Sequence, residues 1–216
     1  MSMSHVSTTY ANVFTRCVVS ALVVAASMGL SPASGQSAGS AGDRIGALYG
    51  VLIETMQHAS QLGIKGRFDR LASVLVDTYD IPSMSRTAVG QSWDMLNSAQ
   101  QADIVDAFTR MMIANYANQF DGFSGERFEV LQTIDKGPTD KLVKTRLVQS
   151  SGKTVALDYL MRNSDGAWKV VDVYLDGTIS ELASRRAEFS AILKSGGPDA
   201  LIASLRRQGD KLLAGA

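Results

Sequence analysis

The chain has 216 residues, of which 45% are hydrophobic and 19% are charged, as is typical of a globular protein with one buried core. Its 21 basic and 21 acidic residues cancel, so a basic surface for nucleic acid is not expected. The single cysteine, Cys17, excludes an intramolecular disulfide.

The first 42 residues differ from the rest of the chain. They contain no acid, and their only Lys or Arg is Arg16, which precedes an apolar run over 17–30. This run is too short to span a bilayer comfortably, and the small residues at 33–35 suit a signal peptidase. A retained N-terminal anchor is the alternative. We predict a cleaved signal peptide over 1–35, a disordered linker over 36–42 and a single domain over 43–214.

Helical spacing of apolar residues predicts two helices at the start of the domain, over 43–60 and 64–79, with a break at Gly63. Pro82 then begins a short third helix, because proline fits the first turn of a helix. Gly90 is expected to end that helix.

The clearest helix spans 97–120. Ser98 and Gln101 form a predicted capping box, and a wide apolar stripe should face the core. Two further helices are expected near the C-terminus, over 179–193 and 199–213.

Between these helices, the sequence predicts four strands. Two lie over 128–135 and 141–149, and a hairpin follows over 153–177. Its turn contains Asp165 and Gly166, which tolerate the positive φ of a tight connection. Strands joined by such short links form an antiparallel meander. The predicted fold class is therefore α+β, a curved four-stranded sheet wrapped by N- and C-terminal helices.

The hairpin has two largely apolar faces, so it must be covered on both sides or line a cavity. A shift of one residue would exchange the faces. One face carries the row Val155, Leu157, Tyr159, Val171, Val173 and Leu175. The alternative face carries Trp168, Val170 and Tyr174.

The sequence offers little catalytic chemistry. His58 is the only histidine beyond the predicted signal, so a multi-histidine metal site is excluded. Asp158 and Asp172 lie on neighbouring strands and are either an acid–base pair or hydrogen-bond acceptors. Six methionines are expected to face inward, where they fill the core or line a cavity for apolar ligands. They are Met56, Met84, Met95, Met111, Met112 and Met161.

Two blocks of residues stand out by their order and spacing. The first contains Tyr79, Asp80, Met84, Ala88, Gly90, Trp93, Gln100, Gln101, Phe108, Tyr116 and Ala117. The second contains Val155, Leu157, Asp158, Tyr159, 168–173, Asp176, Gly177, Ser180, Arg186 and Phe189. Together they resemble the MlaC or toluene-tolerance family of periplasmic lipid-transport proteins.

The resemblance implies a periplasmic carrier that holds phospholipid acyl chains in an apolar cavity between sheet and helices. It also implies partners: an outer-membrane lipoprotein complex and an inner-membrane ABC transporter with its MCE-domain protein. The segment 176–180 departs from the common pattern, because many members place the serine nearer the glycine. The sequence GGPDALIASLRRQ near the end looks like the branch associated with hopanoid biosynthesis. The expected ligand is therefore a phospholipid or a hopanoid.

We expect a monomer that is not an enzyme and binds no cofactor, metal or nucleic acid. The alternatives are an α+β enzyme that uses a pocket aspartate, Asp172, and an interaction module without a ligand. Arg185 and Arg186 either meet a lipid headgroup or are solvated. The predicted lipid-lining residues are Tyr116, Phe120, Val155, Leu157, Tyr159, Val171, Val173, Leu175, Phe189 and Ile192.

Overall fold

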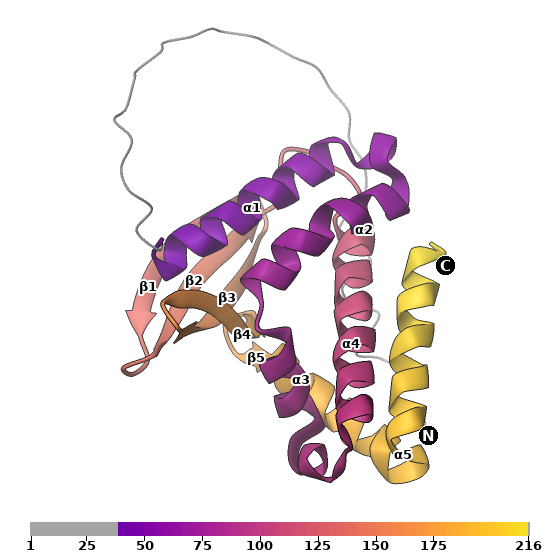
Figure 1. Cartoon of the computed structure of the whole chain (residues 1–216). Coiled ribbons are helices and arrows are strands. Elements are labelled where there is room, and N and C mark those ends of the chain that lie inside the picture. Colours follow the sequence, from indigo (N-terminus) through magenta and orange to yellow (C-terminus); the bar gives the residue numbers. More distant parts are fainter. Residues whose placement is uncertain (1–38, 216) are drawn as a thin grey trace, which may run out of the picture.

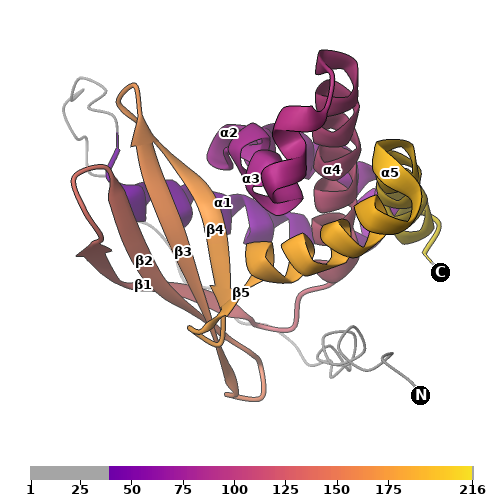
Figure 2. The ribbon, with the colours of Figure 1, turned by 90° about the horizontal axis from the view of Figure 1, so that it is seen from below.

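The computed structural model describes residues 39–215. The predicted signal peptide (1–35) and residues 36–38 of the predicted linker lie outside this part of the chain. Five helices and one short 3₁₀ helix lie on one side of a curved antiparallel sheet (Figure 1, Figure 2). This arrangement confirms the predicted α+β class. No helix within residues 39–215 is long and apolar enough to cross a membrane.

The N-terminal helices are α1 (Ala41–Gln57), α2 (Ala59–Thr78) and α3 (Ile81–Val89), followed by the 3₁₀ helix η1 (Gly90–Met95). Helix α1 begins two residues earlier than predicted, because Ser40 caps it and forms a capping box with Asp43. The predicted break at Gly63 is present as a kink inside α2, where Gly63 has φ 60°.

The longer helices are α4 (Ser98–Gln119) and α5 (Glu181–Leu213). The capping box of α4 is formed by Asn97 and Gln100. The prediction of Ser98 and Gln101 was therefore one residue late, because Asn97 is the last residue with extended backbone (ψ 165°). The predicted boundary between the last two helices is present as a kink inside α5 at Gly197, whose φ is 72°.

The sheet has five strands in the order β1 to β5, each antiparallel to the next, which confirms the meander and corrects the strand number from four. The additional strand, β5, occupies two residues that were predicted to be helical; Ser180 instead pairs with Tyr174 and caps α5. Asp165 (φ 55°) and Gly166 (φ 83°) form the expected turn. The strands are β1 (Arg127–Asp135), β2 (Asp140–Val148), β3 (Thr154–Ser164), β4 (Ala167–Leu175) and β5 (Ile179–Ser180).

A bulge in the β3–β4 ladder changes which residues of β4 share a face. Leu160 pairs with Asp172, but the next residue, Met161, pairs with Val170. Because a bulge inserts one residue, Val170 lies on the same side as Val173, and Val171 leaves the row. The predicted row Val171, Val173 and Leu175 was therefore wrong at Val171.

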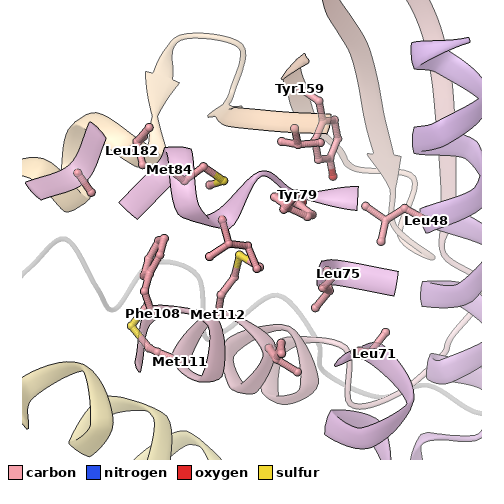
Figure 3. Packing of buried hydrophobic residues seen from close by; sticks show 14 of the residues in the cluster. Leu48, Leu71, Leu75, Tyr79, Met84, Phe108, Met111, Met112, Tyr159 and Leu182 are labelled. Atoms are coloured by element: carbon pink, nitrogen blue, oxygen red, sulfur yellow. The ribbon is translucent and has the colours of Figure 1, made fainter. Parts of the chain in front are cut away.

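One continuous apolar core lies between the sheet and the helices. Figure 3 shows side chains from α1, α2, α3, α4, α5 and β3 converging in it, among them Leu48, Leu75 and Tyr159. Five of the six methionines are at most 8% exposed, as predicted. Met95 is 80% exposed, so its inward placement was wrong: it ends η1, outside the apolar stripes.

Candidate functional site

The face of the sheet that meets the helices, called here the inner face, is closed to solvent at its centre. Val143, Tyr159, Met161 and Val170 come from three neighbouring strands, and none is more than 2% exposed. They belong to the same buried cluster as the apolar stripes of the helices. The sheet and the helices therefore share one apolar interior, which is the candidate site.

Four buried or half-buried tyrosines meet in this interior: Tyr49 from α1, Tyr79 after α2, Tyr116 from α4 and Tyr159 from β3. Tyr49 packs edge-on against Tyr159, with 5.9 Å between ring centroids, and Tyr79 packs similarly against Tyr116 at 6.1 Å. The hydroxyls of Tyr79 and Tyr116 share a hydrogen bond, and the Tyr49 hydroxyl bonds that of Thr145 on β2. These pairings satisfy polar atoms that would otherwise be costly to bury.

Burial sets the protonation state of these tyrosines. It raises the pKa of Tyr116 to about 12. Burial likewise raises the pKa of Tyr49, Tyr79 and Tyr159 well above the usual value of 10.0. All four are therefore neutral at physiological pH, and the interior carries no charge from them.

Seven of the ten predicted lipid-lining residues meet in this interior. Phe120, Tyr159 and Phe189 belong to the buried cluster, and four others pack against it: Tyr116, Leu157, Val173 and Ile192. The remaining three, Val155, Val171 and Leu175, lie outside the cluster. Contact with lipid stays a prediction for all ten.

Sequence reasoning missed interior residues on α1 and on β4. Tyr49 stacks on Phe128 with 4.4 Å between ring centroids and bonds Thr145, so it joins α1 to the sheet. Its spacing of four residues from Ile45 on α1 was the signal that could have found it. Val170 was assigned to the alternative face, and only knowledge of the bulge would have moved it inward.

Two pockets of about 440 Å³ each lie at other places in the part of the chain that the structure describes. One lies over strands β1 to β3 and the turn after β4, and the other lies beside α4 and the second half of α5. Neither of these two pockets lies between sheet and helices, and the apolar cavity stays a prediction.

The candidate catalytic residues do not point to a reaction centre in this interior. The Asp172 carboxylate accepts hydrogen bonds from Val173 N (2.8 Å), Ser180 Oγ (2.6 Å) and Leu182 N (3.1 Å), which anchors the start of α5 on β4. His58 is exposed at the end of α1 and bonds the Glu54 carbonyl. Within residues 39–215, no group of three or more His, Cys, Asp or Glu could hold a metal.

An open antiparallel meander with all helices on one side, and an apolar core between them, defines the class of α+β domain to which this chain belongs. The sequence matches the family model described as MlaC protein over residues 50–207, and the chain belongs to the MlaC family.

Among solved structures, the chain is similar to the phospholipid-binding protein from Ralstonia solanacearum, determined in complex with a phospholipid. The TM-score is 0.72 at 21% sequence identity, and the match covers 81% of this chain and 99% of that one. A search of the curated proteins gives no match. The structural likeness confirms the fold.

Proposed function

We propose that this protein is a periplasmic lipid carrier that holds acyl chains between the inner face of its sheet and its helices. The observation that carries the proposal is the continuous apolar core that joins these two layers in a chain of the MlaC family. The related fold of the Ralstonia protein, determined with a phospholipid, supports the same ligand class.

The energetics favour a protein-bound acyl chain over a free one. Removing a sixteen-carbon chain from water is worth about 13 kcal/mol, at roughly 0.8 kcal/mol per CH₂. Moving the chain from a bilayer into an apolar protein interior exchanges one apolar environment for another. A carrier of this kind therefore needs no chemical step of its own to extract and release lipid.

Lipid must enter by displacing the packing between sheet and helices. The helices pack more extensively on one another, above all α4 on α5, than on the sheet. Two hydrogen bonds cross the boundary near the centre, one between the Tyr49 and Thr145 hydroxyls and one from Asp80 N to Val170 O (2.9 Å). Breaking both costs about 2 kcal/mol at roughly 1 kcal/mol each.

The methionines make this displacement easier. Met84, Met111, Met112 and Met161 are buried in the interior, and their unbranched side chains adapt to irregular apolar shapes. We propose that they rearrange around the acyl chains while Asp172 keeps α5 attached to β4.

The carrier role also requires partners that load and unload it. We propose exchange with an outer-membrane lipoprotein complex and an inner-membrane ABC transporter complex, in the periplasm after removal of residues 1–35. The support for these steps is membership of the MlaC family.

A vesicle extraction assay tests the function. Purified protein is incubated with vesicles that contain a fluorescent phospholipid, separated from them by flotation, and analysed for bound lipid by mass spectrometry. We expect the soluble fraction to contain lipid in a fixed ratio to protein. Protein without lipid after this treatment, and after purification from its native host, would contradict the proposal.

A further inference from the structure

The face of the sheet that points away from the helices, called here the outer face, contains a pocket of about 440 Å³ (the outer-face pocket). Figure 2 shows the helices gathered on the opposite side of the sheet. The pocket is lined by residues of β1, β2 and β3 and by the turn after β4. Its polar lining includes Gln132, Lys144, Thr154, Asp158 and Asp176.

The floor of this pocket is an irregular part of the β2–β3 ladder. The pairs Val143 with Tyr159 and Arg146 with Ala156 keep one register, which places Lys144 opposite Asp158. At this level Thr145 N donates to the Asp158 carboxylate (3.3 Å), and the Thr145 hydroxyl donates to the Leu157 carbonyl. Side-chain hydrogen bonds of Thr145 and Asp158 therefore join β2 to β3 at the floor of the pocket.

The Asp158 carboxylate uses only one of its two oxygens in hydrogen bonds within residues 39–215. The residue is 3% exposed, and its Oδ1 accepts the bond from Thr145 N. Its Oδ2 makes no hydrogen bond within residues 39–215 and faces Gly177, where an added Cβ would lie 3.6 Å from it. Because Gly177 has no side chain, the oxygen stays open to the pocket. Oδ2 is not among the fully buried atoms of residues 39–215 that lack a partner, so it is accessible from the pocket and can accept a hydrogen bond from a ligand.

The charged side chains of Lys144, Asp158 and Asp176 around this oxygen form no ion pair with one another in the described part of the chain. Among the ion pairs of residues 39–215, none joins Lys144 to Asp158 or to Asp176, although all three line the pocket. The other cation of the lining, Arg146, is held by Glu129 at 2.6 Å. The pocket therefore offers carboxylates on one side and an available ammonium group on the other.

We propose that the outer-face pocket binds a small zwitterion that carries an ammonium group and a phosphate or carboxylate group. The ligand's ammonium group donates to Asp158 Oδ2, and its anionic group pairs with Lys144. Phosphoethanolamine has this chemistry, whether it occurs in a free molecule or as a lipid headgroup. The site lies on the opposite face of the sheet from the proposed acyl-chain interior, so either proposal can fail alone.

The test is a titration of the full mature protein with glycerophosphoethanolamine, followed by NMR chemical shifts and calorimetry. We expect saturable binding with shifts at the outer-face pocket, and much weaker binding of ethanolamine or glycerol 3-phosphate alone. Asp158→Asn removes the negative charge but keeps an oxygen that accepts from Thr145 N. Lys144→Gln removes the positive charge of a half-buried side chain. Each should weaken binding roughly tenfold or more.

Asp199→Asn, in the pocket beside α4 and α5, is the matched control and should bind normally. Circular dichroism checks that each variant is folded, and lipid extraction should be unchanged in all three. Sedimentation with phosphatidylethanolamine vesicles, compared with phosphatidylglycerol vesicles, distinguishes a lipid headgroup from a free molecule. No saturable binding, or binding that neither pocket variant weakens, would overturn the proposal.

Discussion

The two faces of the sheet are made by the same strands, yet they have opposite chemistry. On β2 and β3, Val143, Tyr159 and Met161 point into the core, whereas the alternate residues Lys144 and Asp158 line the outer-face pocket. Successive side chains of a strand point to opposite sides, so one strand serves an apolar interior and a charged pocket at once. The two proposed binding sites therefore lie on opposite faces of the same strands.

The first prediction tests this division with two neighbouring residues. Met161→Ala removes a fully buried inner-face side chain and should lower the free energy of unfolding by about 3 kcal/mol. Leu160→Ala removes a half-buried outer-face side chain and should cost about 1 kcal/mol. Urea unfolding of both variants measures the difference. Equal losses would show that the two faces are not energetically distinct.

The second prediction concerns Asp172, an outer-face residue whose loss should cost more stability than the loss of Leu160. Asp172→Ala removes three hydrogen bonds, two of which hold β4 to β5 and α5, and it should cost about 2 kcal/mol. Asp106→Ala, at an exposed position of α4, is the control and should change stability by less than about 0.5 kcal/mol. If the two variants unfold at the same urea concentration, Asp172 does not anchor α5.

The third prediction is that the inner face is apolar only while its tyrosines are protonated. Their raised pKa values mean that the unfolded chain releases phenolic protons above pH 10 which the folded protein retains. Stability should therefore be constant up to about pH 10 and then fall, by about 1.4 kcal/mol per pH unit for each buried tyrosine. The contribution of Tyr116 is fully lost only near its folded pKa of about 12.

Urea unfolding at a series of alkaline pH values measures this slope. The double variant Tyr79→Phe with Tyr116→Phe replaces both partners of one hydrogen bond, so it should be nearly neutral at pH 7. Its stability should fall less steeply above pH 10. An unchanged slope would mean that these two hydroxyls do not stay protonated in the folded protein.

The fourth prediction has the smallest expected effect. Lys144→Gln changes a half-buried side chain of the outer-face pocket that makes no ion pair within residues 39–215. Its free energy of unfolding should change by less than about 0.5 kcal/mol. A larger loss would mean that Lys144 supports the sheet and is not free for a ligand.

Much of the fold could be predicted from the sequence because its signals are local. The turn at Asp165 and Gly166, the break at Gly63 and the apolar stripe of α4 each depend on residues close together in the chain. The predicted placement of Val171 was wrong because it depends on a contact between two strands and not on neighbouring residues. The bulge between Leu160 and Met161 depends on how two strands fit each other, and no residue type in β4 marks it.

The candidate site was predicted less completely than the fold. The face carrying Leu157 and Tyr159 does point inward, as the alternating pattern indicated. What the inward side chains contact could not be predicted, because a row of apolar side chains is the same whether it contacts other side chains or a ligand. The outer-face pocket was also missed, since it depends on the register that brings Lys144 opposite Asp158.

The central claim is that lipid lies against the inner face, and a pair of tryptophan variants tests it most directly. Leu157→Trp adds volume on the inner face beside the core, and Leu160→Trp adds the same volume on the outer face. Native mass spectrometry measures bound lipid in both folded variants. We predict lower occupancy for Leu157→Trp and wild-type occupancy for Leu160→Trp. Equal occupancy in the two variants, or a loss confined to Leu160→Trp, would contradict the account.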